Sequence, residues 1–170
     1  IRKNTYSENL NLAENLATDI NNILSESESL MQLAANTNRV KSMKPENMKY
    51  ILKELVNTSP YLVNVYVMDQ TGMQIFKTTG SLGDRSDRGY FQQALNGEST
   101  FSNVIISRSR GVPIVVHARP IENNNNVVGV LGASIDLGAL SEMAANQNPG
   151  ETGYGYVVEN SGKVIAHPRE

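Results

Sequence analysis

Apolar residues recur at three- and four-residue steps through the first third of the chain, which predicts an amphipathic helix. Polar residues fill the intervening positions, and neither Pro nor Gly interrupts residues 1–44. We predict a helix over about residues 5–35, on the order of 45 Å long at about 1.5 Å per residue. Because this exceeds the width of a small domain, part of the apolar stripe can cover a domain while the rest meets a partner or forms a stalk. The stripe consists of Ala13, Leu16, Ala17, Ile20, Ile23, Leu24, Leu30, Met31 and Ala34.

A second helix is expected after Pro45, since proline suits the first helical turn. Residues 61–68 are apolar on both alternating faces, which predicts a central strand that is covered on both sides. Short helices are expected over residues 90–95 and 137–146, and a hairpin over residues 154–166. Four further strands are predicted over residues 73–78, 100–107, 113–121 and 127–136.

This order of elements predicts an α+β fold, with a long N-terminal helix and a five-stranded antiparallel sheet of PAS type in meander order, flanked by helices. The last hairpin echoes the first, since residues 67–72 read VMDQTG and residues 157–162 read VVENSG. We therefore expect a second, truncated module after the first. The predicted division is residues 1–57 for the stalk helix and second helix, 58–148 for the PAS-like module and 149–170 for the start of the next module.

Composition narrows the possible functions of these 170 residues. The chain has 15 basic and 17 acidic residues and a net charge of -2, which does not favour a nucleic-acid partner. It has no cysteine, which excludes disulfides, thiolate metal sites and a cysteine nucleophile. The longest nearly apolar run, residues 127–133, is far shorter than the roughly 20 residues of a membrane span. The first and last residues indicate a piece of a longer protein, so any spans are expected outside it.

A series of short motifs in a fixed order resembles the double Cache family. That family supplies extracytoplasmic sensor domains of methyl-accepting chemotaxis proteins and sensor histidine kinases. The motifs are Arg88-Gly89-Tyr90-Phe91, Ala94, Gly97, Ser107, Gly111-Val112-Pro113, Pro120, Gly129-Val130-Leu131-Gly132, residues 150–158 (GETGYGYVV) and Ile165-Ala166-His167-Pro168.

The resemblance implies a small-molecule sensor, without enzyme activity or cofactor, on the extracytoplasmic side of a cell-membrane receptor. It implies a ligand pocket in the membrane-distal module, a membrane-proximal module of which the start is present, and transmembrane helices outside this chain. Two copies of the long helix are expected to pack side by side in a receptor homodimer.

The resemblance also implies site residues. Arg88 is expected to hold a ligand carboxylate through its guanidinium fork, with Tyr90 and Phe91 as walls that exclude water. Ser107 belongs to the same motif set, and Arg108 occupies an upstream position that is acidic in relatives binding amino acids. Ser134 occupies the position of the aspartate that binds a ligand amine, and the nearest carboxylate is Asp136. This favours organic acids or other small polar ligands over α-amino acids.

Other interpretations stay open at this point. Arg88 could form only an exposed ion pair with Asp84 or Asp87. Ser107, His117 and Asp136 lie on neighbouring predicted strands and could form the Ser–His–Asp site of a small hydrolase, although no nucleophile elbow accompanies them. The chain could also be a structural dimerisation module whose pocket is lost. His117 and His167 are not in a metal-ligand spacing, so no metal is expected.

Overall fold

The computed structural model describes residues 2–146, 149, 153–159 and 161–167. Two compact units make up the chain. Unit 1 combines Ile1–Ser25 with Leu137–Glu170, and unit 2 is Glu26–Asp136. The first helix, α1 (Arg2–Ala35), contributes residues to both units and confirms the long helix that the apolar stripe predicts.

In unit 2, the end of α1 is followed by two shorter helices, α2 (Asn38–Lys41) and α3 (Pro45–Thr58). The sequence pattern did not predict α2, which has only four residues and is capped by Thr37, whose hydroxyl accepts from the N–H of Val40 at 3.3 Å. Pro45 opens α3 as predicted, because its missing N–H is not needed in a first turn.

The sheet of unit 2 is antiparallel, and its strand order is β2-β1-β6-β5-β3, with β4 also paired to β5. The predicted meander order is therefore wrong: the first strand lies inside the sheet, between the second and the sixth. This placement suits β1, because a strand that is apolar on both faces gains most from being covered on both. The bounds are β1 (Leu62–Met68), β2 (Gln74–Lys77), β3 (Thr100–Phe101), β4 (Ile105–Ile106), β5 (Pro113–Asn123) and β6 (Asn126–Asp136).

Residues 100–107 form two short strands on one edge of β5 rather than the single strand predicted. Between them, Ser102 donates its N–H to the carbonyl of Val116 at 2.8 Å. The Ser102 hydroxyl accepts from the N–H of Val116 at 2.9 Å. A side-chain acceptor thus replaces a backbone carbonyl, and the edge strand is interrupted at that point.

The β5–β6 hairpin turns at Asn124 and Asn125, as predicted, with φ values of 49° and 62°. Asparagine tolerates this left-handed conformation, which the tight turn between twisted strands requires. The turn after β1 places Gly72, at φ 90°, against the loop that follows β2. A side chain there would approach the Cα of Ser86 to 2.5 Å, and the Gly72 carbonyl accepts from the N–H of Arg85 at 2.9 Å.

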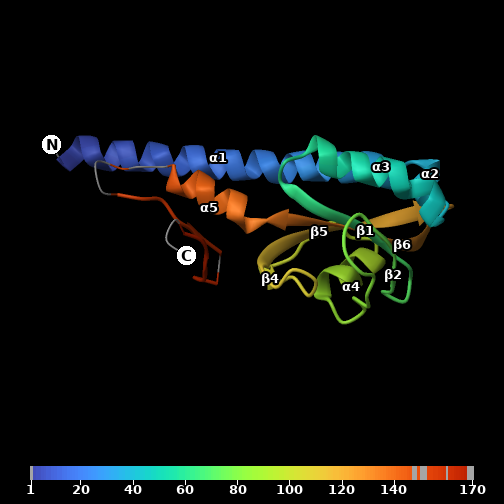
Figure 1. Cartoon of the computed structure of the whole chain (residues 1–170). Coiled ribbons are helices and arrows are strands. Elements are labelled where there is room, and N and C mark those ends of the chain that lie inside the picture. Colours follow the sequence, from blue (N-terminus) through green and yellow to red (C-terminus); the bar gives the residue numbers. More distant parts are fainter. Residues whose placement is uncertain (1, 147–148, 150–152, 160, 168–170) are drawn as a thin grey trace. The chain divides into compact units, whose positions relative to one another are not determined.

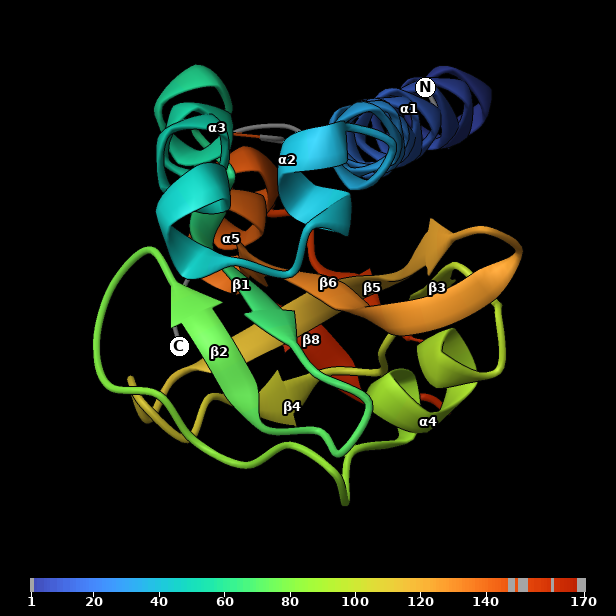
Figure 2. The ribbon, with the colours of Figure 1, turned by 90° about the vertical axis from the view of Figure 1, so that its right-hand side faces the viewer.

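Helices cover both faces of this sheet. Figures 1 and 2 show α2 and α3 on one face and α4 (Gly89–Leu95) on the other. Side chains alternate along β1, so Tyr66 and Met68 join the α4 side while Val65 and Val67 point to the opposite face. The core on the α4 side consists of Tyr66, Met68, Tyr90, Phe91, Ala94, Ile114, Val116, Ala118 and Val130.

Unit 1 holds the first part of α1, α5 (Leu137–Ala145) and a hairpin of β7 (Val157–Val158) and β8 (Val164–Ala166). The hairpin confirms the strand–turn–strand predicted near the end of the chain. Residues 150–152 of the motif GETGYGYVV, residue 160 of the turn, and residues 168–170 lie outside the described residues. Among the described helices, none combines the length and hydrophobicity that crossing a bilayer requires.

Candidate ligand-binding site

A small cavity lies on the α4 face of the sheet in unit 2. Its volume is about 20 Å³, which is room for about one water molecule. Five of the seven residues that the sequence predicts for the site line it, namely Arg88, Tyr90, Ser107, Arg108 and Ser134. The sequence interpretation missed the other ten lining residues, Asn64, Tyr66, Gln74, Lys77, Arg85, Ile105, Ile106, Ser109, Ile114 and Val116.

Arg88 is held at the start of α4 by its main chain. Its N–H donates to the carbonyl of Arg85 at 3.0 Å, and its own carbonyl accepts from the N–H groups of Phe91 and Gln92 at 3.0 and 3.2 Å. The Nε atom of the side chain is buried, and it has no hydrogen-bond partner among the described residues. Because a buried donor without an acceptor is costly, this guanidinium is suited to an incoming acceptor.

Two tyrosines bring their hydroxyl groups together in the cavity wall. Tyr66 donates to the hydroxyl of Tyr90 at 3.3 Å. Burial, with the neighbouring Tyr90 as a second cause, raises the pKa of Tyr66 well above its usual range, and burial also raises the pKa of Tyr90. Both rings therefore keep their protons at neutral pH and act as hydroxyl groups rather than phenolates.

The Tyr66 ring lies across Gly132, its cross-strand partner on β6. A Cβ at position 132 would clash with Cε2 of that ring. The glycine thus leaves the space in which the tyrosine reaches the cavity, which gives the motif Gly129-Val130-Leu131-Gly132 a local structural reason.

The two amide side chains of the cavity wall already accept hydrogen bonds within the protein. The side-chain carbonyl of Asn64 accepts from the hydroxyl of Thr78 at 2.9 Å. The side-chain carbonyl of Gln74 accepts from the N–H of Gly83 at 3.1 Å. Each of these amide oxygens therefore already has one donor within the protein.

Four cationic side chains line the cavity, from Lys77, Arg85, Arg88 and Arg108. Burial, and then the nearby charge of Arg85, lowers the pKa of Lys77. Arg108 makes a two-pronged ion pair with Asp87, at 2.9 and 2.5 Å, and these bonds lower the pKa of the Asp87 carboxyl. One alternative from the sequence was an exposed ion pair between Arg88 and Asp87. In the structure the Asp87 carboxylate pairs with Arg108 instead.

The remaining two predicted site residues lie elsewhere. Phe91 is buried in the core beneath α4, with 3% of its surface exposed, and does not line the cavity. Asp136 lies at the end of β6, where its carboxylate pairs with Arg110 at 3.3 Å. Neither position supports a direct contact with a ligand in this cavity.

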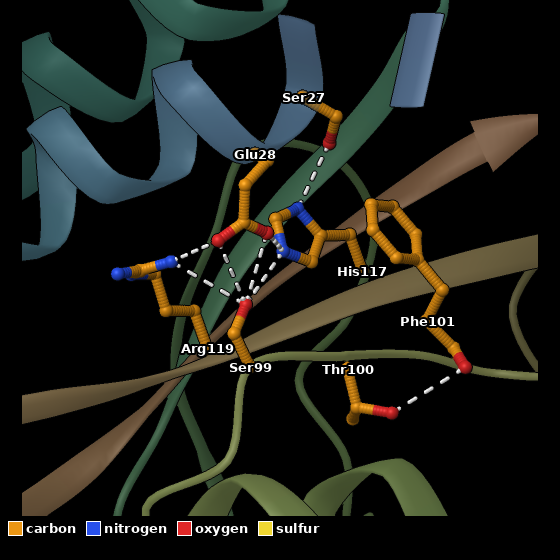
Figure 3. A network of polar contacts seen from close by, with 7 residues as sticks. All are labelled: Ser27, Glu28, Ser99, Thr100, Phe101, His117 and Arg119. Carbon is orange, nitrogen blue, oxygen red and sulfur yellow. Dashed lines mark hydrogen bonds and ion pairs between the residues drawn. The ribbon is translucent and has the colours of Figure 1, made fainter. Parts of the chain in front are cut away.

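A second polar cluster lies on the opposite face of the sheet (Figure 3). The ring of His117, on β5, is fully buried and stacks on Phe101 with centroids 4.3 Å apart. Its Nδ1 lies 3.0 Å from the hydroxyl of Ser27, and its Nε2 lies 2.7 Å from the carboxylate of Glu28. Glu28 also pairs with Arg119 and accepts from Ser99.

Burial lowers the pKa of His117, even though the Glu28 carboxylate acts in the opposite direction. The neutral ring then donates from Nε2 to Glu28 and accepts at Nδ1 from Ser27. Burial raises the pKa of Glu28, but its hydrogen bond from Ser99 and the neighbouring His117 and Arg119 outweigh this effect, so the pKa is lowered overall.

The hypothetical hydrolase site of Ser107, His117 and Asp136 is not assembled. His117 points to the face covered by α1 and bonds Ser27 and Glu28, whereas Ser107 lines the cavity on the other face. Ser27 and His117 have 2% and 0% of their surfaces exposed, so the Ser27 hydroxyl is not open to a substrate.

We expect acid to destabilise unit 2 through His117. Its pKa is lower in the folded chain than in the unfolded chain, where it is about 6.5. The stability that the neutral ring contributes is therefore complete above about pH 6.5 and is lost as pH falls through the pKa of His117 in the folded chain.

The variant His117→Gln tests this expectation, because its side chain keeps an N–H for Glu28 but cannot titrate. Melting temperatures measured from about pH 7.5 to about pH 5.5 should fall more steeply for the parent chain than for this variant. Parallel curves would contradict the prediction.

The whole chain, residues 1–170, matches a family model described as Cache domain. The methyl-accepting chemotaxis protein PscA of Pseudomonas syringae pv. tomato is 31% identical over 86 residues. That match covers 50% of this chain and 14% of the relative, so the chain spans only a small part of that protein's length.

Solved structures of similar fold are ligand-binding domains of chemoreceptors. The Pseudomonas fluorescens CtaA domain with L-leucine has a TM-score of 0.80 at 23% identity, over 99% of this chain and 72% of that one. The CtaA domain with L-serine has a TM-score of 0.78 at 24% identity, over 99% and 74%. The Campylobacter jejuni Tlp3 domain with 4-methylisoleucine has a TM-score of 0.78 at 17% identity, over 98% and 71%. These likenesses confirm the α+β fold, and the family model that matches residues 1–170 shows that this chain belongs to the Cache domain family.

Proposed function

We propose that this chain is the extracytoplasmic sensor domain of a membrane-bound chemoreceptor or sensor histidine kinase, and that unit 2 binds a small carboxylate-bearing ligand at Arg88. The observation that carries the proposal is the buried Nε of Arg88, a donor without a partner among the described residues, in the wall of a cavity. A guanidinium offers a carboxylate two parallel hydrogen bonds, and such charge-assisted bonds are stronger where water is excluded.

The neighbours of Arg88 support the same chemistry. Tyr66 and Tyr90 present hydroxyl groups that stay protonated, and Ser107 and Ser134 add two more that are largely buried. These groups can donate to a carboxylate oxygen or to a ligand hydroxyl. Of the residues predicted from the sequence, we therefore expect Arg88 and Tyr90 to contact the ligand. Ser107, Arg108 and Ser134 line the cavity around them.

The ligand we propose differs from those of the solved relatives, whose structures contain L-leucine, L-serine and 4-methylisoleucine. An amino acid carries an ammonium group, which needs an acceptor or a carboxylate. Here Ser134 stands where the resemblance places an aspartate, and no Asp or Glu is among the cavity-lining residues that the structure describes. We therefore expect weak or no binding of the common L-amino acids.

In the receptor, residues 58–148 would form the membrane-distal module and residues 149–170 would begin the membrane-proximal one. Residues 1–57 would provide the stalk helix and second helix, and α1 would pack against its copy in a homodimer anchored by flanking transmembrane helices. Ligand binding could then act by favouring one of two arrangements of that dimer, since only a difference in affinity can shift them.

A ligand panel tests this function directly. We expect at least one small carboxylate among acetate, butyrate, L-lactate and succinate to raise the melting temperature, and L-leucine and L-serine to have little effect. A ligand at about 100 times its Kd adds about 2.7 kcal/mol of stability. A generic ester is included as a hydrolase substrate, and turnover of it would favour an enzyme. Stabilisation by none of the carboxylates would contradict the proposal.

A further inference from the structure

The charges around the cavity do not balance. Lys77, Arg85, Arg88 and Arg108 line it. Two carboxylates lie beside it: Asp87 pairs with Arg108, and Asp84 accepts from the N–H of Ser86. Four cations against two carboxylates leave two positive charges uncompensated, which is more than one carboxylate at Arg88 would neutralise.

The excess is concentrated at the end of β2 and on the loop that follows it. The Lys77 ammonium donates to the carbonyl of Ser81 at 3.3 Å, and the Arg85 guanidinium donates to the carbonyl of Asp84 at 2.6 Å. These are neutral backbone acceptors, and the structure describes no carboxylate in an ion pair with either side chain. The lowered pKa of Lys77, from burial and then from Arg85, is consistent with two cations held close together.

The wall of the cavity also includes the aliphatic side chains of Ile105, Ile114 and Val116. A wall that combines several cationic groups with apolar surface suits a short carbon chain that carries more than one acidic group. A single compact anion, such as phosphate, would leave the apolar surface unused.

We propose that the site takes a small dicarboxylate without an amine, with one carboxylate at Arg88 and the other at Lys77 and Arg85. This inference rests on the proposed function and names its ligand class. An ammonium group would be repelled by the four cations, and the acceptors of Asn64 and Gln74 are already engaged. Entry requires the cavity to widen, and the Arg108–Asp87 pair at its edge is exposed, so separating it costs little.

Calorimetric titrations of the chain test the proposal with succinate, butyrate, L-aspartate and inorganic phosphate. Succinate is expected to bind at least about tenfold more tightly than butyrate, because charged hydrogen-bonded pairs contribute on that scale. Lys77→Met and Arg85→Met should each weaken succinate by about tenfold and weaken butyrate much less. Lys49→Met, on the exposed surface of α3, is the matched control and should change neither ligand.

The outcomes separate this inference from the function on which it rests. Equal affinity for succinate and butyrate, or tighter binding of L-aspartate or phosphate than of succinate, overturns the dicarboxylate class but leaves a ligand site at Arg88. Unchanged succinate binding in both the Lys77→Met and Arg85→Met variants overturns the placement of the second carboxylate. Succinate that binds equally well to an Arg88→Ala variant contradicts the proposed function itself.

Discussion

Replacing Arg88 with alanine is expected to weaken the strongest carboxylate ligand of the panel by at least about 30-fold, while the chain stays folded. Truncating one partner of a buried, hydrogen-bonded charge pair typically costs about 2–5 kcal/mol of binding free energy. Folding should not suffer in the same way, because the Nε that is removed has no partner among the described residues. Calorimetry gives the affinity, and thermal unfolding without ligand gives the stability.

Two further variants give this experiment its controls. Arg88→Lys keeps the positive charge but loses the planar fork, so its affinity should lie between those of the parent chain and the alanine variant. Arg110→Ala removes an arginine that pairs with Asp136 and does not line the cavity, so ligand affinity should not change. If Arg110→Ala weakens binding as much as Arg88→Ala does, a general effect of surface charge explains the result and the site assignment is wrong.

The second large effect is expected from Gly132→Ala. The new methyl group would clash with the Tyr66 ring, so the ring must shift from its position in the cavity wall. Overpacking of this kind costs roughly 1–3 kcal/mol of the free energy of unfolding. Because Tyr66 also contributes a cavity hydroxyl, ligand affinity should fall together with stability.

A double-mutant cycle separates this steric conflict from other effects of the substitution. In a Tyr66→Ala background the ring is gone, so adding Gly132→Ala should cost less than about 0.5 kcal/mol, the usual range for a change that meets no obstacle. Gly89→Ala is the matched control, because its new methyl group would meet nothing within 4 Å. A Gly132→Ala penalty of the same size with and without the Tyr66 ring would show that the conflict lies elsewhere.

The helices and most strands follow from local patterns. A stripe with helical spacing predicts α1 closely, because one face of a helix must be apolar to be covered. Alternation on both faces marks β1 as an inner strand, and the asparagine tract marks the β5–β6 turn. The motif around Arg88 also indicates part of the cavity wall from the sequence alone. These features depend on residues a few positions apart, whose interactions the chain itself brings together.

The rest of the site depends on residues far apart in sequence. Tyr66 becomes a wall residue because β1 pairs with β6, and this pairing could not be derived from a predicted meander. In the sequence, Lys77 lies at the end of a predicted strand and Arg85 in a loop, and nothing local marks either as a site residue. They join the cavity wall only because the loop folds back against the turn that follows β1. Asn64 and Tyr66 could have been identified from the sequence, because they place polar atoms two positions apart, on one face of a strand that is otherwise apolar.

His117 shows the same limit on the other face of the sheet. The sequence places it near Ser107 and Asp136 along neighbouring strands, whereas the fold pairs it with Ser27, 90 residues away, and with Glu28. Side-chain alternation along β5 determines which face of the sheet His117 lies on. The order of the strands and the position of the helices determine which residues contact its ring on that face. Local preferences thus define the elements of this chain, while partners, charge balance and pKa values arise only when packing the core brings distant segments into contact.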